Sequence, residues 1–282
     1  MTTAAGASVG WVEKTLAGIT GSIEQAVFTE HHARQPAFLQ QVDPRAKLGA
    51  FLAMVLAAGL TGSLLPLVAL YTVTLAAAVA SRIPFNVFVR RVWLGIPLFA
   101  AIVVIPSIFF VPGERLFDIA IGPIHIAPSI PGLTGAILFV SRVGVSVSLA
   151  VLLVLTTPWA DVLKSLRVLR VPQVFVLVLS MAYRYLFLFL HTVNGVLLAR
   201  RSRTVGRTTG AEQRRWITGQ IGSLIGRSFK MSGDVYAAMV ARGFDGEMRA
   251  YSAYRMRPTD WAVLIGAVAV AVVAVAGGRV VG

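Results

Sequence analysis

Residues 198–257 read LARRSRTVGRTTGAEQRRWITGQIGSLIGRSFKMSGDVYAAMVARGFDGEMRAYSAYRMR, a basic stretch set between two apolar runs. Its basic residues are Arg200, Arg201, Arg203, Arg207, Arg214, Arg215, Arg227, Lys230, Arg242, Arg249, Arg255 and Arg257, and its acidic residues are Glu212, Asp234, Asp245 and Glu247. Loops rich in lysine and arginine stay on the cytoplasmic side of membrane proteins. We therefore expect this segment to be cytoplasmic and to contact a soluble partner, while the flanking apolar runs form a membrane scaffold.

The composition of the whole chain is that of a polytopic membrane protein. Its 282 residues are 56% hydrophobic and only 13% charged, whereas soluble domains carry about 25% charged residues. The lack of cysteine excludes disulfides, iron–sulfur clusters and thiol catalysis. The net charge of +14 would suggest nucleic-acid binding in a soluble protein, but here the positive-inside bias of cytoplasmic loops accounts for it. No signal peptide is expected, because the chain begins with a polar, mixed stretch.

The first part of the chain predicts a surface helix and then two short spans. Apolar residues recur every three or four positions over residues 9–33, which indicates an amphipathic helix. Asp43 and Pro44 then suit the N-cap and the first position of a helix. The apolar run at 48–80, broken at Thr61-Gly62-Ser63, has room for two spans joined by a tight turn.

Three further spans are predicted at residues 92–111, 133–156 and 261–276. Pro97 and Pro106 fall in the first of these and invite kinks. Arg142 falls within the second, where partial snorkelling toward the interface and a structural ion pair are both open alternatives.

The run at residues 171–193 is apolar enough to span, but we predict that it does not. If it crossed, the basic segment after it would lie outside the cell, against the charge bias. A helix or helix pair lying obliquely in the cytoplasmic leaflet fits better, preceded by a short amphipathic helix at 158–171. The predicted fold is an all-α integral membrane protein with about five transmembrane helices and an amphipathic cytoplasmic-side domain. The N-terminus is expected in the cytoplasm and Gly282 outside.

The predicted organisation has four parts. They are an amphipathic N-terminal segment (1–44), transmembrane helices one to four (45–157), a cytoplasmic-leaflet domain (158–257) and a last transmembrane helix (258–282).

Two predicted helices of the basic segment end in arginine. One covers residues 193–203 and ends in Arg200, Arg201 and Arg203; the other covers residues 230–242 and is followed by Gly243. Glycine is favoured just past a helix C-terminus, and arginine there complements the helix dipole, so a plain helix cap is one interpretation. The pairing of two such tips favours another, in which each arginine enters an acidic groove of a partner and pairs with a carboxylate.

At these motifs the chain resembles the transmembrane T components of energy-coupling-factor (ECF) importers. The motifs that carry the resemblance are Asp43-Pro44-Arg45-Ala46-Lys47-Leu48, Tyr183-Arg184-Tyr185-Leu186, the arginine-rich 199–203 and Tyr236-x-x-Met239-x-Ala241-Arg242-Gly243-Phe244. The resemblance implies a coupling-helix domain that joins two ABC ATPase subunits to a membrane S component, in the plasma membrane of a prokaryote. It also implies that ATP and magnesium bind to the ATPases, and that this chain binds no cofactor.

The resemblance also assigns ATPase coupling to two groups of residues. They are Ala199, Arg200, Ser202 and Arg203 at the first tip, and Ala241, Arg242 and Gly243 at the second. The Ala-Arg-Gly pattern of the family falls on Ser202-Arg203-Thr204 at the first tip and keeps only its arginine, so the contact is expected from either Arg203 or Arg200.

The N-terminal extension before Asp43 is similar to cobalt-type (CbiQ-like) T components. This similarity favours cobalt or nickel as cargo. A vitamin importer, for example of biotin, and a passive membrane anchor for a cytoplasmic complex are the alternatives.

Other function classes lack the sequence features that they need. The acidic residues are sparse and the 4 histidines are scattered, so no catalytic or metal site is predicted and the chain is not expected to be an enzyme. A secondary transporter would show matching repeats, and we find none. Gly206-Arg207-Thr208-Thr209-Gly210 lacks the Gly-Lys-Ser/Thr ending of a phosphate-binding loop, so ATP chemistry is expected from partners.

Overall fold

A computed structural model describes residues 37–112, 114, 119–121, 124–126, 129–204, 209–246 and 256–281, together with Gly18 and Gly21. Contacts divide the chain into two compact units. The bundle consists of Val27–Leu169 and Tyr254–Gly282, and the other unit consists of Met1–Ala26 and Arg170–Ala253. Apart from the two glycines, the amphipathic helix predicted at 9–33 lies outside the described residues.

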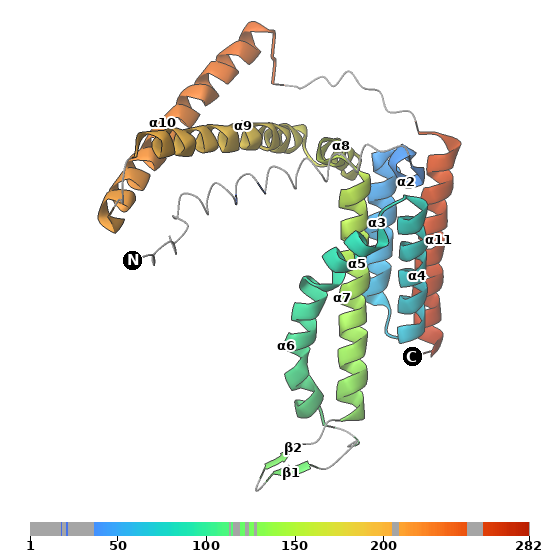
Figure 1. The fold of residues 1–282 in the computed structure, drawn as a ribbon. Helices are drawn as coiled ribbons and strands as arrows, with labels where there is room; N and C mark the ends of the chain where they lie inside the picture. Colours follow the sequence, from blue (N-terminus) through green and yellow to red (C-terminus); the bar gives the residue numbers. More distant parts are fainter. Residues whose placement is uncertain are drawn as a thin grey trace. The chain divides into compact units, whose positions relative to one another are not determined.

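The bundle is built from helices that pack along one another (Figure 1). Its helices are α2 (Phe38–Gln41), α3 (Pro44–Leu60), α4 (Leu64–Ala80), α5 (Phe85–Trp93), α6 (Ile96–Phe110), α7 (Ile130–Thr156), α8 (Trp159–Ser165), the 3-10 turn η1 (Leu166–Leu169) and α11 (Pro258–Val281). Strands β1 (Ile119–Ile121) and β2 (Ile124–Ile126) pair antiparallel between α6 and α7. Helix α11, the last in the chain, packs along α3, and α7 contacts α3, α4, α5 and α6.

The second unit contains two long helices, which we call the helix pair. They are α9 (Gln173–Arg203) and α10 (Gly210–Ala241).

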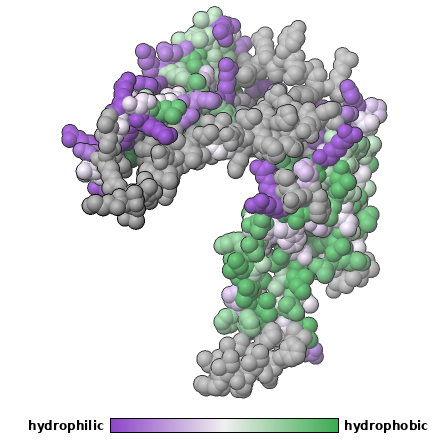
Figure 2. Space-filling model, viewed as in Figure 1, coloured by the Kyte–Doolittle hydropathy of each residue, from purple (hydrophilic) through white to green (hydrophobic). Residues whose placement is uncertain are grey.

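The described helices confirm the prediction of an all-α integral membrane protein. Three of them are long and apolar enough to cross a membrane, namely Ile130–Thr156, Gln173–Arg203 and Pro258–Arg279, and α4 and α6 are shorter apolar helices. Figure 2 shows hydrophobic residues over much of the visible surface of the bundle. Exposed apolar side chains on helices of this kind are suited to lipid. The number of spans and their direction stay predictions.

Asp43 begins α3 as predicted, and the structure adds a second contact at this point. The Asp43 carboxylate accepts a hydrogen bond from the backbone N–H of Arg45 at 2.9 Å, and Pro44 occupies the first helical position. The backbone N–H of Asp43 donates to one oxygen of Asp260 at 3.0 Å, and the other oxygen accepts from the N–H of Arg257 at 2.7 Å. Asp260 is 2% exposed, so one buried carboxylate joins the beginnings of α3 and α11.

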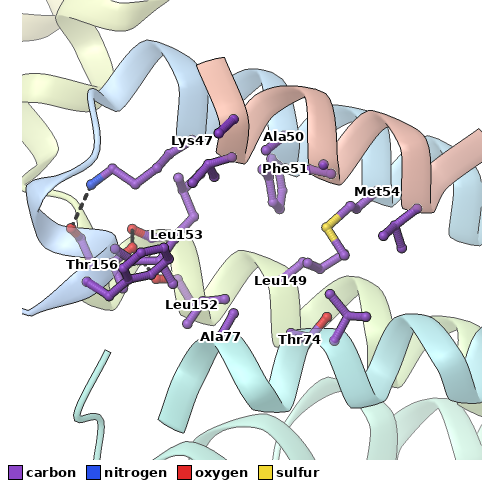
Figure 3. Close-up of a pocket in the computed structure, with 18 residues that line it drawn as sticks. Lys47, Ala50, Phe51, Met54, Thr74, Ala77, Leu149, Leu152, Leu153 and Thr156 are labelled. Carbon is purple, nitrogen blue, oxygen red and sulfur yellow. Dashed lines mark hydrogen bonds between the residues drawn. The ribbon is translucent and has the colours of Figure 1, made fainter. Parts of the chain in front are cut away.

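Lys47 ties the same end of the bundle to α7. Its side chain is buried, and its Nζ donates to the backbone carbonyl of Thr156 at 3.0 Å (Figure 3). The carbonyls in the last turn of a helix have no partner within the helix, so Lys47 satisfies one of them at the end of α7. Beside it lies a mainly apolar cavity of about 220 Å³ between α3, α4, α7 and α11.

Helix α5 was not predicted, and it corrects the beginning of the third span. Val92 belongs to α5, and α6 begins at Ile96 rather than at Val92. Phe88 and Val92 are buried in α5, whereas Arg90 and Arg91 are exposed. An amphipathic helix of this kind suits the membrane surface better than the membrane interior.

The two prolines of α6 have different surroundings. Pro97 lies in the first turn of α6, where a backbone N–H would find no acceptor within the helix. A proline at this position therefore fits the helix without a kink. Pro106 lies inside α6, at an interior position of the predicted third span.

Arg142 makes a contact that neither expectation included. Its Nη2 donates to the backbone carbonyl of Thr61 at 2.8 Å, at the C-terminal end of α3. The turn between α3 and α4 is therefore held by a cation from α7, which satisfies a carbonyl that the helix cannot. Gly278 of α11 packs against the same turn, because an added Cβ would lie 3.0 Å from the Cγ2 of Thr61.

Candidate functional site

Helix α9 joins two segments that were predicted separately. It runs without a break from Gln173 to Arg203, so the predicted beginning of a new helix at Val193 is wrong. The last turn carries Arg200, Arg201 and Arg203, as predicted. The apolar stretch and the first arginine tip therefore belong to one rigid element.

Helix α10 begins at Gly210 rather than at Lys230, and a capping box explains this. The backbone N–H of Thr209 donates to the Glu212 carboxylate at 3.0 Å, and the N–H of Glu212 donates to the Thr209 hydroxyl at 3.4 Å. These bonds satisfy two N–H groups that have no acceptor within the helix. The hydrogen bond from the Thr209 backbone lowers the pKa of Glu212, with a smaller contribution from the Thr209 side chain.

The second arginine tip is a Schellman motif. Arg242 is the C-cap of α10, and Gly243 follows with a φ of +81°. The N–H of Gly243 donates to the Val240 carbonyl at 2.9 Å, and the N–H of Phe244 donates to the Met239 carbonyl at 3.0 Å. This is the pattern of a helix that ends on a left-handed glycine. The helix-cap interpretation of Gly243 is thus confirmed, and it leaves the Arg242 side chain exposed at the end of a rigid helix.

The two helices of the pair run antiparallel and cross. Residues 196–203 of α9, with its C-cap Thr204, share a cavity with residues 212–227 of α10. Residues 177–189 of α9 share another cavity with residues 228–239 of α10. Thr192 and Arg227 line a smaller cavity between these two regions. Figure 1 shows the crossing.

The two arginine tips lie on opposite sides of the point where α9 and α10 cross. At 1.5 Å per residue along the helix axes, Arg203 lies roughly 16 Å from the crossing and Arg242 roughly 22 Å from it on the other side.

Arg200 and Arg203 have different surroundings, although the sequence left both as candidates for the first tip. The guanidinium of Arg200 lies over the Trp216 ring, 4.1 Å from its centroid, and the residue is half-buried. Cation–π contacts of this kind hold a guanidinium in place. Arg203, the last residue of α9, is exposed. Arg203 is therefore the exposed arginine of the first tip, whereas Arg200 lies between α9 and α10.

The small residues beside the arginines are also exposed. Ala199 and Ala241 leave room for close approach of another surface. The Ser202 hydroxyl donates to the Leu198 carbonyl at 3.1 Å, within its own helix.

An apolar groove of about 630 Å³ between the diverging halves of the helix pair was missed by the sequence analysis. Its lining includes Met181, Tyr185, Phe189, Val235, Tyr236, Met239 and Phe244. Several of these residues belong to the motifs around Tyr183 and Tyr236. Their helical spacing was a signal that could have indicated one shared surface.

No group of three or more His, Cys, Asp or Glu side chains in the described part of the chain could hold a metal ion.

The comparison with known families decides the relationship. Residues 35–252 match the family model CbiQ, described as cobalt transport protein. The chain belongs to the CbiQ family. Among its relatives, this CbiQ-family chain is 32% identical over 255 residues to the uncharacterized protein MJ1571 of Methanocaldococcus jannaschii, which covers 90% of the chain and 87% of the relative.

Two named relatives extend the comparison. The cobalt transport protein CbiQ of Rhodobacter capsulatus is 33% identical over 158 residues, 54% of the chain and 62% of the relative. The energy-coupling factor transporter transmembrane protein EcfT of Listeria innocua is 25% identical over 222 residues, 74% of the chain and 82% of the relative. The resemblance to ECF T components is therefore confirmed, and the family is one of transport components.

Proposed function

We propose that this chain is the membrane scaffold and coupling subunit of an ECF-type importer. In this proposal it joins two ABC ATPase subunits to a substrate-binding S component in the cell membrane. The observation that carries the proposal is the pair of exposed arginines, Arg203 and Arg242, at the opposite ends of two crossing helices. The name of the EcfT relative supports it.

The cargo in this proposal is a cobalt or nickel ion. The description of the family and the name of the Rhodobacter capsulatus relative support a metal rather than a vitamin. The S component would capture the ion, and this chain would transmit the motion that releases it.

ATP hydrolysis belongs to the partner subunits. ATP and magnesium would bind to the ATPases, whose closure would press on Arg203 and Arg242 in acidic grooves. Because α9 and α10 are continuous helices, the push would pass along them into the apolar groove between them. Side-chain packing against the S component would then carry the motion, without a pore through this chain.

Purification from the native membrane tests the proposal. The tagged full chain should retain two ATPase subunits and one further membrane protein, and the assembly should hydrolyse ATP. The chain stripped of its partners should have no ATPase activity. Retention of an enzyme or a receptor without ATPases would support a passive anchor instead, and vigorous hydrolysis by the isolated chain would refute the assignment of ATP chemistry to partners.

The proposed topology predicts the side on which the basic segment is labelled. The chain has no native cysteine, so a single Arg207→Cys substitution provides an unambiguous label site. We expect an impermeant thiol reagent to label it only after the membrane is opened, because arginine-rich loops remain cytoplasmic. A cysteine at Gly282 should react from outside in intact cells. Labelling of residue 207 in intact cells would mean that α9 crosses the membrane.

A further inference from the structure

A basic cavity of about 610 Å³ lies between the C-terminal end of α9 and the first half of α10, across the crossing from Arg242. Its polar and aromatic lining includes Arg200, Arg203, Arg227, Glu212, Gln220 and Trp216. Three arginines thus face one carboxylate. That carboxylate already accepts a hydrogen bond from the backbone N–H of Thr209 at 3.0 Å. With three arginines and one glutamate in its lining, the cavity has an excess of positive charge.

Arg200 gives this cavity a fixed donor that lacks an acceptor. Its guanidinium lies over Trp216 at 4.1 Å, and its Nη1 is buried without a hydrogen-bond partner among the described residues. A guanidinium carries five N–H donors in one plane, and buried donors are nearly always paired. An anion with several oxygen atoms would balance the excess charge and accept hydrogen bonds from the guanidinium groups that line the cavity.

We propose that this cavity binds the phosphate of an anionic phospholipid headgroup. Arginine pairs with phosphate through two parallel hydrogen bonds, which lysine cannot form. The neighbouring surface favours a lipid over free phosphate, since Leu198, Ile221 and Ile225 are 48%, 52% and 52% exposed. Apolar side chains next to tryptophan and arginine are typical of the membrane interface.

The lipid assignment does not depend on the proposed coupling to ATPases. It uses the cavity between α9 and α10, in which Arg242 takes no part. Arg203 belongs both to the cavity lining and to the first tip, so the test relies on Arg227, which lines the cavity and belongs to neither tip.

A fluorescence titration of the full chain in detergent tests the proposal. The probe is short-chain phosphatidylglycerol, and the signal of Trp216 is the difference between the wild type and Trp216→Phe, because the chain has 5 tryptophans. We expect a saturable change with phosphatidylglycerol. Arg227→Gln should weaken binding at least tenfold; Arg227 is exposed, so this substitution should leave the fold intact. Arg215→Gln, on the same helix outside the cavity lining, is the matched control and should leave binding unchanged.

Two further probes separate the possible sources of the signal. Phosphatidylcholine of the same chain length should bind at least tenfold more weakly than phosphatidylglycerol, and equal binding would overturn the need for an anionic headgroup. Inorganic phosphate should also be at least tenfold weaker, and equal affinity would replace the lipid by a free anion. Equal losses in Arg227→Gln and Arg215→Gln would reduce the site to diffuse attraction and overturn the proposal.

Discussion

Replacing Arg242 by alanine is expected to weaken docking of one ATPase subunit more than tenfold, while the chain still inserts normally. An arginine at the centre of an interface commonly contributes about 2 kcal/mol or more, because its removal leaves an acidic partner unpaired. At about 1.4 kcal/mol for each factor of ten, such a loss exceeds tenfold. Co-purification of the ATPases with the tagged chain, combined with a transport assay, measures the effect. Arg203→Ala should act in the same way on the other tip, and the double substitution should prevent assembly.

The control for this experiment is another exposed arginine on the same helix pair. Arg214 lies near the beginning of α10, at the opposite end of that helix from Arg242. If Arg214→Ala and Arg242→Ala reduce co-purification equally, the interaction is general electrostatic adhesion rather than docking of specific tips. Arg242→Lys should restore docking poorly, since lysine cannot make the bidentate pair with a carboxylate.

Asp260→Ala is expected to destabilise the bundle by about 3 kcal/mol. The substitution leaves the N–H groups of Asp43 and Arg257 without the charged acceptor that both use, and such bonds contribute about 1.5–3 kcal/mol each. For a chain of this size, the apparent melting temperature in detergent should fall by roughly 6–12 °C.

Two further variants serve as controls for this stability measurement. Asp260→Asn keeps one carbonyl oxygen as an acceptor and should recover part of the loss. Asp234→Ala removes an exposed carboxylate from α10 and should change the melting temperature little. If Asp260→Ala and Asp234→Ala have the same melting temperature, the buried carboxylate does not stabilise the beginnings of α3 and α11.

The sequence predicted those parts of the fold whose signals are local. Asp43 and Pro44 give a helix start through their own chemistry, and Gly243 gives a helix end, because each depends only on neighbouring backbone. The capping box at Thr209 and Glu212 was equally readable. The predicted helix nevertheless began only at Lys230, after a segment whose helix propensity is lowered by Gly219, Gly222 and Gly226.

Other parts depended on contacts between distant residues and could not be predicted. Nothing in the sequence places Trp216 beneath Arg200, so the choice between Arg200 and Arg203 needed the crossing of α9 and α10. Arg142 contacts the carbonyl of Thr61 across 81 residues of sequence, and Asp260 contacts Asp43 across 217 residues. Buried polar groups of this kind find partners through packing, which hydrophobic periodicity does not encode. The assignment of both tips to ATPases stays a prediction.

Because α9 and α10 are unbroken, their crossing can act as the pivot about which each helix turns as a rigid lever. Neither helix has an internal break at which a push could be absorbed. With a lever arm of roughly 22 Å, a rotation of about 10° displaces the Arg242 end by roughly 4 Å. The same rotation changes the angle between the diverging halves of α9 and α10. The apolar groove lined by Met181, Tyr185 and Met239 would therefore widen or narrow with it. In the proposed mechanism, force applied by the ATPases at the two tips would thereby be converted into a change in the width of this groove, as in a pair of scissors.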